Sequence, residues 1–94
     1  MKLVFSNIYF YSILDEESFE FYLKNISNKI ERIGSKIIIQ IEKKSLTKEK
    51  LRNIFGLIER YCITVDNIED LISNKNKDYI LNPAMFWYKY FTKK

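Results

Sequence analysis

The chain of 94 residues contains no histidine, one cysteine, one proline and two glycines. Histidine is the commonest general base in enzymes and the commonest metal ligand, so its absence excludes most familiar catalytic and metal-binding arrangements. Cys62 stands alone, which excludes a disulfide framework and a cysteine metal cluster. An enzyme would have to work with carboxylates. We therefore expect a protein that is not an enzyme and holds neither metal nor cofactor.

Long hydrophobic runs are also absent. No stretch approaches the roughly 18 uninterrupted apolar residues that a membrane span requires. The start, Met1 to Phe5, resembles a signal peptide, but Ser6 and Asn7 interrupt its apolar run and acids follow at Asp15 to Glu17. We expect this segment to form a core strand, and the protein to be cytoplasmic with no membrane partner.

The composition that is present favours a single folded domain over residues 1–94, because 47% of the residues are hydrophobic and 16% are aromatic. The net charge of +4 admits a nucleic-acid or acidic-protein partner. Lysine, isoleucine and asparagine are all abundant, a bias that AT-rich coding also produces. We therefore interpret most of the basic charge as a result of this compositional bias and not as a sign of function.

The first quarter of the chain predicts a strand and a helix. Lys2 to Leu14 is rich in β-branched and aromatic residues with apolar groups on both faces, which predicts a central strand or one covered by helices. A helix over Glu16 to Asn25 follows, with Asp15 as its cap. Its apolar residues at helical spacing are Phe19, Tyr22, Leu23 and Ile26.

A hairpin is predicted between Lys29 and Glu42. Gly34-Ser35 suits a tight two-residue turn, since glycine accepts a positive φ at little steric cost. The second strand alternates, with one buried face and one mixed face. The residues of its buried face are Ile37, Ile39 and Ile41.

The next segment predicts a helix over Lys48 to Tyr61, capped by Ser45 or Thr47. We expect its apolar stripe to pack on the isoleucine strand; the stripe is Leu51, Ile54, Phe55 and Ile58. Gly56 interrupts this helix and costs about 1 kcal/mol relative to alanine unless something packs closely there. The lysines around the helix start are interpreted as a solvated surface rather than a phosphate-facing or acid-facing patch.

A third helix is predicted from Thr64, its cap, through Ser73, with its apolar side chains inward. Its outer face carries a compact acidic patch, which is our candidate partner-binding site: Asp66, Glu69 and Asp70. Asn82-Pro83 is typical of a cap followed by a first helical turn. For the aromatic run Phe86 to Phe91, a closing strand and a short helix remain open.

These elements together predict an α+β fold. A strand, a helix and a hairpin follow one another along the chain. Their strands form a small, largely antiparallel sheet, which packs with two or three helices and an aromatic C-terminal segment.

Three groups of residues have a chemical interpretation and a structural one. The acids from Asp15 to Glu20 suit a helix start better than a metal site. Cys62 is interpreted as a small core residue, because no histidine exists to activate it as a nucleophile. The aromatic and lysine residues from Phe86 to Lys94 could form a stacking platform for single-stranded nucleic acid, but they more often serve as core residues or partner anchors.

A resemblance to a known family is carried by segments throughout the chain. These are Ile13 to Glu17 with Phe19; Leu51-Arg52, Phe55, Leu57-Ile58 and Arg60-Tyr61; Ile63 to Leu71; Asn76; Asn82-Pro83; and Trp87 to Lys89 with Phe91. In these positions the chain resembles small bacterial immunity proteins that accompany contact-dependent growth inhibition toxins.

The resemblance implies a non-enzymatic protein that binds the C-terminal effector domain of a cognate toxin, usually a nuclease, and blocks it. It implies no catalytic residues, and it transfers no binding residues. The net basic charge departs from the acidic character that is common among inhibitors of basic nucleases. The alternative functions are a small basic nucleic-acid-binding or phage-type inhibitor protein and, from another class, an enzyme that uses carboxylates.

Overall fold

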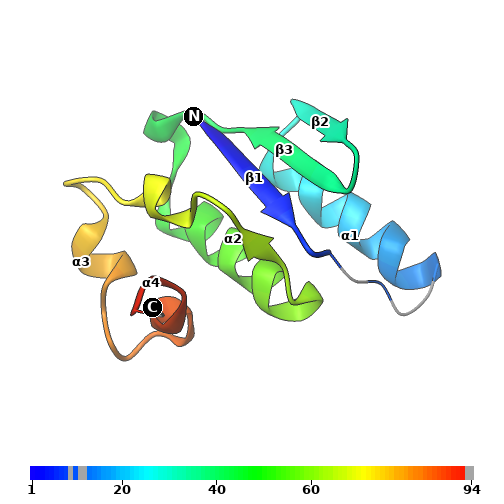
Figure 1. Ribbon diagram of the computed structural model, residues 1–94. Coiled ribbons are helices and arrows are strands. Elements are labelled where there is room, and N and C mark those ends of the chain that lie inside the picture. Colours follow the sequence, from blue (N-terminus) through cyan, green and yellow to red (C-terminus); the bar gives the residue numbers. More distant parts are fainter. Residues whose placement is uncertain (9, 11–12, 93–94) are drawn as a thin grey trace.

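A computed structural model describes residues 1–8, 10 and 13–92 as one antiparallel sheet with helices against it (Figure 1). The strand order is β2-β3-β1-β4. Their bounds are β1 (Lys2–Ser6), β2 (Ile30–Ile33), β3 (Lys36–Gln40) and β4 (Thr64–Val65). The predicted α+β fold is confirmed, and so is the central position of the first strand.

The first strand is shorter than predicted. β1 ends at Ser6 because Asn7 takes a positive φ of 54°, a left-handed conformation that asparagine tolerates and that no strand continues through. Ile13 and Leu14 belong to the following helix, so the predicted strand was wrong there. The rest of that prediction falls partly on residues 9, 11 and 12, which lie outside the described residues.

The first helix, α1 (Ile13–Ile26), begins earlier than predicted. Asp15 therefore lies inside the first turn, not before it, where its charge still suits the helix dipole. Phe19, Leu23 and Ile26 are buried as expected, but Tyr22 is partly exposed.

The hairpin is confirmed. β2 and β3 pair antiparallel, and Ile33 opposes Lys36 across the Gly34-Ser35 turn, where Gly34 has a φ of 60°. The predicted inward residues of the second strand are buried: Ile37, Ile39 and Ile41.

The central helix, α2 (Lys48–Tyr61), has the predicted bounds. Thr47 caps it, since its Oγ1 accepts a hydrogen bond from the Lys50 amide at 3.1 Å. At the other end Cys62 takes a left-handed conformation, with φ 53°, and its side chain is exposed. The interpretation of Cys62 as a core residue was wrong, because as the helix C-cap it points to solvent.

The third predicted helix does not form. Thr64 is no helix cap but belongs to β4, which pairs with the end of β1, and a 3₁₀ helix covers only Ile68–Leu71. The β-branched run Ile63-Thr64-Val65 favours an extended chain, and the exposed edge of β1 supplies its hydrogen-bonding partners. Leu71 is buried as predicted, whereas Ile68 is half-buried.

The C-terminal aromatic run is helical. After the short α3 (Lys77–Ile80), a turn at Asn82-Pro83 leads to a 3₁₀ helix, Phe86–Tyr88, and then α4 (Lys89–Thr92). Trp87 is buried, and its Nε1 donates to the Ile80 carbonyl at 3.0 Å. Its ring stacks on that of Phe55, which fixes this segment to α2.

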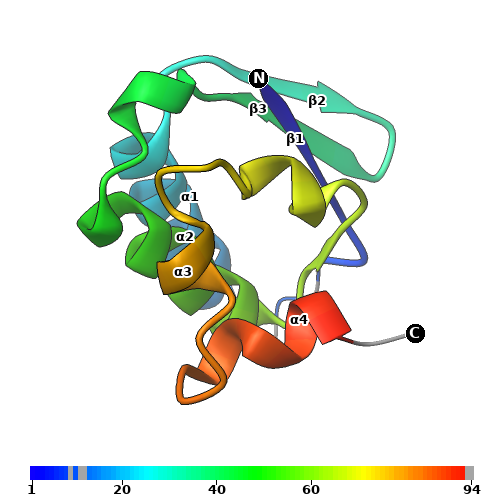
Figure 2. The ribbon, with the colours of Figure 1, turned by 90° about the vertical axis from the view of Figure 1, so that its left-hand side faces the viewer.

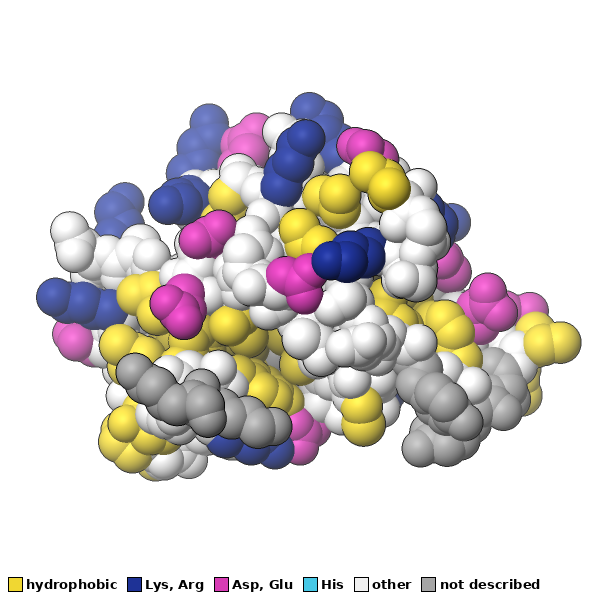
Figure 3. All heavy atoms as spheres, viewed as in Figure 1, with side chains coloured by type: hydrophobic (Ala, Val, Ile, Leu, Met, Phe, Trp, Pro, Cys, Tyr) yellow, Lys and Arg dark blue, Asp and Glu magenta, His cyan; other side chains and the backbone are white. Residues whose placement is uncertain are grey.

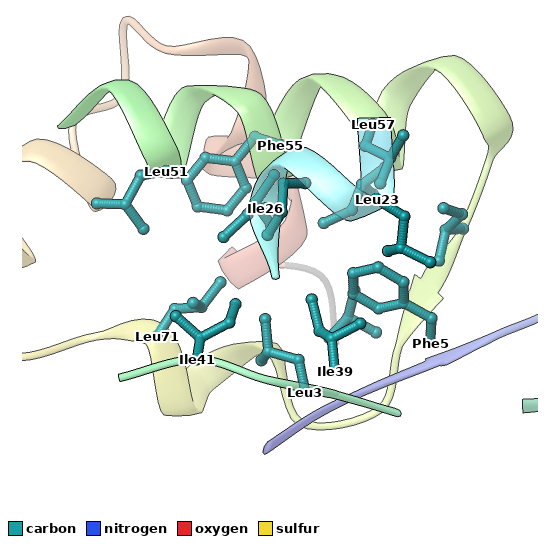
Figure 4. Packing of buried hydrophobic residues seen from close by; sticks show 14 of the residues in the cluster. Leu3, Phe5, Leu23, Ile26, Ile39, Ile41, Leu51, Phe55, Leu57 and Leu71 are labelled. Atoms are coloured by element: carbon teal, nitrogen blue, oxygen red, sulfur yellow. The ribbon is translucent and has the colours of Figure 1, made fainter. Parts of the chain in front are cut away.

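The core lies between the sheet and the helices. α1 and α2 cover one face of the sheet, and the opposite face carries no helix in either view (Figures 1 and 2). Side chains of α1 and α2 meet those of the strands, with Leu71 closing one side (Figure 4). The predicted stripe of α2 is completely or almost completely buried: Leu51, Ile54, Phe55 and Ile58. This arrangement leaves the outer side of α1 facing solvent.

Candidate partner-binding surface

The predicted acidic patch is exposed, but it does not lie on one helix face. Asp66 follows β4 directly, whereas Glu69 and Asp70 belong to the 3₁₀ helix. Asp66 Oδ1 accepts a hydrogen bond from Ser6 Oγ at 2.7 Å, and its Oδ2 pairs with Lys36 Nζ at 2.8 Å. The hydrogen bond from Lys36, followed by that from Ser6, lowers the pKa of the Asp66 carboxyl. Asp66, which follows β4, therefore links this segment to Ser6 of β1 and to Lys36 of β3.

Asp70 is also part of a structural network. Asn67 Oδ1 accepts from the Val4 amide at 3.0 Å, and its Nδ2 donates to the Lys2 carbonyl at 2.6 Å. The same Nδ2 donates to Asp70 Oδ2 at 2.9 Å. Asn67 thus holds the segment after β4 against β1, and Asp70 helps to orient it. Of the three predicted acids, Glu69 is the one with no such bond among the described residues.

A second surface combines apolar and acidic side chains on α1. We define the α1 surface as Ile13, Glu16, Glu17, Glu20 and Phe21, with Lys24 at its C-terminal end; these residues line one shallow hollow. Ile13 is 76% exposed and Phe21 is 65% exposed, so both present large apolar groups to solvent. Hydrophobic and acidic side chains lie side by side over the start of α1 (Figure 3). Exposed apolar groups framed by charges are typical of a protein-binding surface.

The acidic side chains of the α1 surface differ in whether they form an ion pair. Glu20 forms an ion pair with Arg32 of β2. In the described part of the chain, Glu16 and Glu17 form no ion pair or hydrogen bond through their carboxylates. These two carboxylates can therefore pair with cations of another molecule without first losing a partner among the described residues.

A groove of about 510 Å³ lies between α1 and α2, next to this surface. Tyr22, Ile26 and Leu57 form its apolar part, and Arg52 and Arg60 contribute its cations. Phe21 lines both the groove and the hollow of the α1 surface, so the two adjoin at this residue.

Inside the groove, Arg60 Cζ lies 5.1 Å from the centre of the Tyr22 ring. Contact with Tyr22 raises the pKa of the Arg60 guanidinium, which stays charged. The Phe21 and Tyr22 rings meet edge to face, with centroids 5.7 Å apart. The groove therefore joins aromatic and cationic groups in one place.

The C-terminal aromatic run does not present a stacking platform. Trp87 is 2% exposed, and Tyr90 and Phe91 pack against the core. Lys89 pairs with Glu59 at 2.8 Å, and the Tyr90 hydroxyl donates to the same carboxylate. Phe86 is the ring of this run that is largely exposed among the described residues. These rings serve mainly as core anchors.

Two further properties concern the described residues alone. None of the helices that they form has both the length and the apolar composition needed to cross a bilayer. Within residues 1–8, 10 and 13–92, no three side chains of the types that ligate metals gather closely enough to hold an ion.

From the sequence, the acids from Asp15 to Glu20 are the next candidate interface after the patch at 66–70, but the exposed apolar side chains beside them were missed, although their signal was present. The helix has apolar residues on every side, not on one stripe alone. Phe21 lies two positions beyond the buried Phe19, which places it roughly opposite the core on a helix of about 3.6 residues per turn. An aromatic side chain at that position has no core to enter.

Comparison with known proteins finds no family model, curated protein or solved structure that matches this chain.

Proposed function

We propose that this protein is a non-enzymatic immunity protein that binds and neutralises the effector domain of a contact-dependent growth inhibition toxin in the cytoplasm. The observation that carries the proposal is the α1 surface, where exposed Ile13 and Phe21 line the same hollow as the carboxylates of Glu16 and Glu17, which have no partner among the described residues. The sequence resemblance supports the same class of protein.

The charges of this surface fit a nuclease partner. A nuclease that handles phosphates presents a cationic cleft, and acidic side chains that cover such a cleft steer the encounter and fix the register of the complex. The net charge of the chain is +4, but the charge of the α1 surface has the opposite sign. Phe21 and Ile13 then supply the apolar contacts that hold the partner after the encounter.

The α1 surface is a better partner site than the acidic patch at 66–70. Asp66 and Asp70 already bind groups of this chain, so a partner would have to compete for them. Large exposed apolar side chains surround Glu16 and Glu17, whereas Asp66 lies next to Ser6 and Lys36.

The proposal predicts a toxin gene immediately upstream, and the test produces the C-terminal domain of that toxin in bacteria with and without this protein. We expect the parent protein to restore growth and to form a complex with the purified toxin domain. Glu16→Lys/Glu17→Lys should abolish both effects. The matched control is Glu69→Lys/Asp78→Lys, which makes the same change of charge at exposed carboxylates elsewhere.

The outcomes separate the candidate surfaces. Failure of the parent to protect cells from that toxin would refute the proposed function. Loss of protection by the control pair alone would move the interface from α1 to the region around Glu69. Circular dichroism of each variant verifies that the fold is retained.

A further inference from the structure

The fold does not explain why residue 56 is a glycine. It lies inside α2, where glycine weakens a helix relative to alanine. Its φ is not positive, so the backbone does not demand glycine. A Cβ built at this position would meet no atom within 4 Å, so close packing does not demand it either. What the missing side chain provides is open space in the α1–α2 groove.

The walls of this space suit an aromatic ring. The Arg60 guanidinium and the Tyr22 ring already lie against each other, and Phe21 stands at the rim. Planar guanidinium groups and aromatic edges both attract the face of a ring. Leu57 and Ile26 add an apolar floor, and the side chain of Arg52 is in no ion pair among the described residues.

We propose that the groove beside Gly56 receives an aromatic side chain of the protein that binds the α1 surface. This inference rests on the proposed function for the identity of that partner, the toxin domain. Because Phe21 borders both the groove and the hollow that holds Glu16 and Glu17, the anchor has basic residues on the side that faces the hollow and none beside its ring, where Arg52 and Arg60 line the groove. Its cations meet the carboxylates while its ring enters the groove.

The first experiment examines the groove without the toxin. N-acetyl-tryptophan amide is titrated into isotope-labelled protein, and amide chemical shifts are followed by NMR. We expect shifts of Tyr22, Gly56 and Arg60 in the parent. Gly56→Ala, which adds a single methyl group, should retain them, whereas Gly56→Leu, whose side chain projects into the groove at this position, should lose them. Thermal unfolding of both variants should occur at or above the parent temperature, because each replaces a helical glycine.

Two probes give the opposing outcomes. N-acetyl-leucine amide, which has no ring, should cause smaller shifts at the same residues. Adenosine monophosphate is the competing probe, because Arg52 and Arg60 can also pair with a phosphate. Groove shifts with the nucleotide but not with the tryptophan amide would overturn the inference in favour of a nucleotide site. No groove shift with the tryptophan amide up to its solubility limit would also overturn it.

The second experiment measures affinity for the upstream toxin domain. Gly56→Leu should weaken binding by at least about tenfold, the loss typical of an important anchor, while Gly56→Ala should bind as the parent does. Equal binding by Gly56→Leu would refute the groove assignment and leave the proposed function standing. Binding of the tryptophan amide without any neutralisation of the toxin would refute the function and support the aromatic site.

Discussion

The ring of Phe55 stacks on the indole of Trp87, with centroids 4.8 Å apart and planes inclined by 21°. Phe91 meets the same phenylalanine edge to face, with centroids 5.8 Å apart. The middle of α2 and the C-terminal segment therefore share one aromatic cluster. Phe55 is completely buried, so its side chain stabilises the fold both by its own burial and by fixing Trp87.

Replacing Phe55 with alanine tests this arrangement. We expect Phe55→Ala to lower the free energy of unfolding by about 3–5 kcal/mol, the usual range for a buried phenylalanine. Denaturant unfolding followed by tryptophan fluorescence measures the loss and reports on Trp87 directly. The control is Phe21→Ala, which removes the same ring from the surface and should change stability by less than about 0.5 kcal/mol. A loss below about 1 kcal/mol for Phe55→Ala would show that the α2 stripe is not core.

Glu59 predicts how stability depends on pH. The hydrogen bond from Lys89, followed by that from Tyr90, lowers the pKa of the Glu59 carboxyl below 4.5. A carboxyl with a lowered pKa in the folded state stabilises the fold above its unfolded pKa, and this contribution disappears as pH falls through the folded value. Glu59→Gln should therefore flatten the loss of stability on acidification below about pH 4.5.

Denaturant unfolding at a series of pH values measures this effect. The control is the pair of variants Lys89→Ala and Lys89→Ala/Glu59→Gln. Without Lys89 the glutamine substitution should have a smaller effect, since the first cause of the pKa shift is gone. An unchanged acid limb in Glu59→Gln would show that this ion pair does not form in solution.

Reversal of the acidic patch has a structural consequence. Asp66→Lys would place a cation beside Lys36 and remove the acceptor of Ser6, so the triple reversal of Asp66, Glu69 and Asp70 should lower the thermal unfolding temperature. Glu69→Lys alone should leave this temperature unchanged, because Glu69 is exposed and unbonded among the described residues. The triple variant therefore cannot report on toxin binding by itself. Unfolding of the triple variant at the parent temperature would contradict the structural role of Asp66.

Nucleic-acid binding gives a separate prediction. Because most rings of the C-terminal run are packed on the core, we expect no stacking-dependent affinity for single-stranded RNA or DNA. Fluorescence anisotropy at low salt is the measurement, since electrostatic binding is strongest there and declines as salt rises. Tight binding that is lost in Phe86→Ala would revive the alternative of a small basic nucleic-acid-binding protein.

The sequence predicted local elements better than distant pairings. The bounds of α2 follow from a cap at Thr47 and an apolar stripe, both encoded within the helix itself. The segment after Tyr61 was mistaken for a helix because its apolar spacing also fits a helix. Its actual conformation depends on pairing between Val65 and Phe5, which no local pattern reveals.

In the candidate site, too, local features could be predicted from the sequence and contacts between distant residues could not. Exposure of Asp66, Glu69 and Asp70 was predicted from their place on the outer face of a helix; the three residues are exposed, although that helix does not form. The hydrogen bond that ties Asp66 to Ser6 could not be predicted, because those residues are 60 positions apart. Gly56 drew notice as a costly residue within a helix, but its place in a groove emerged only when α1 was positioned.

The strand order β2-β3-β1-β4 also constrains how the chain reaches its fold. β1 is synthesised before the other strands of this sheet, yet its outer neighbour, β4, follows it by about sixty residues. One edge of β1 therefore lacks its hydrogen-bonding partner until the whole of α2 has been synthesised. This raises the contact order of a small domain and slows its folding. Folding therefore ends with a late step, in which residues 64–67 form hydrogen bonds with β1, a strand synthesised well before them.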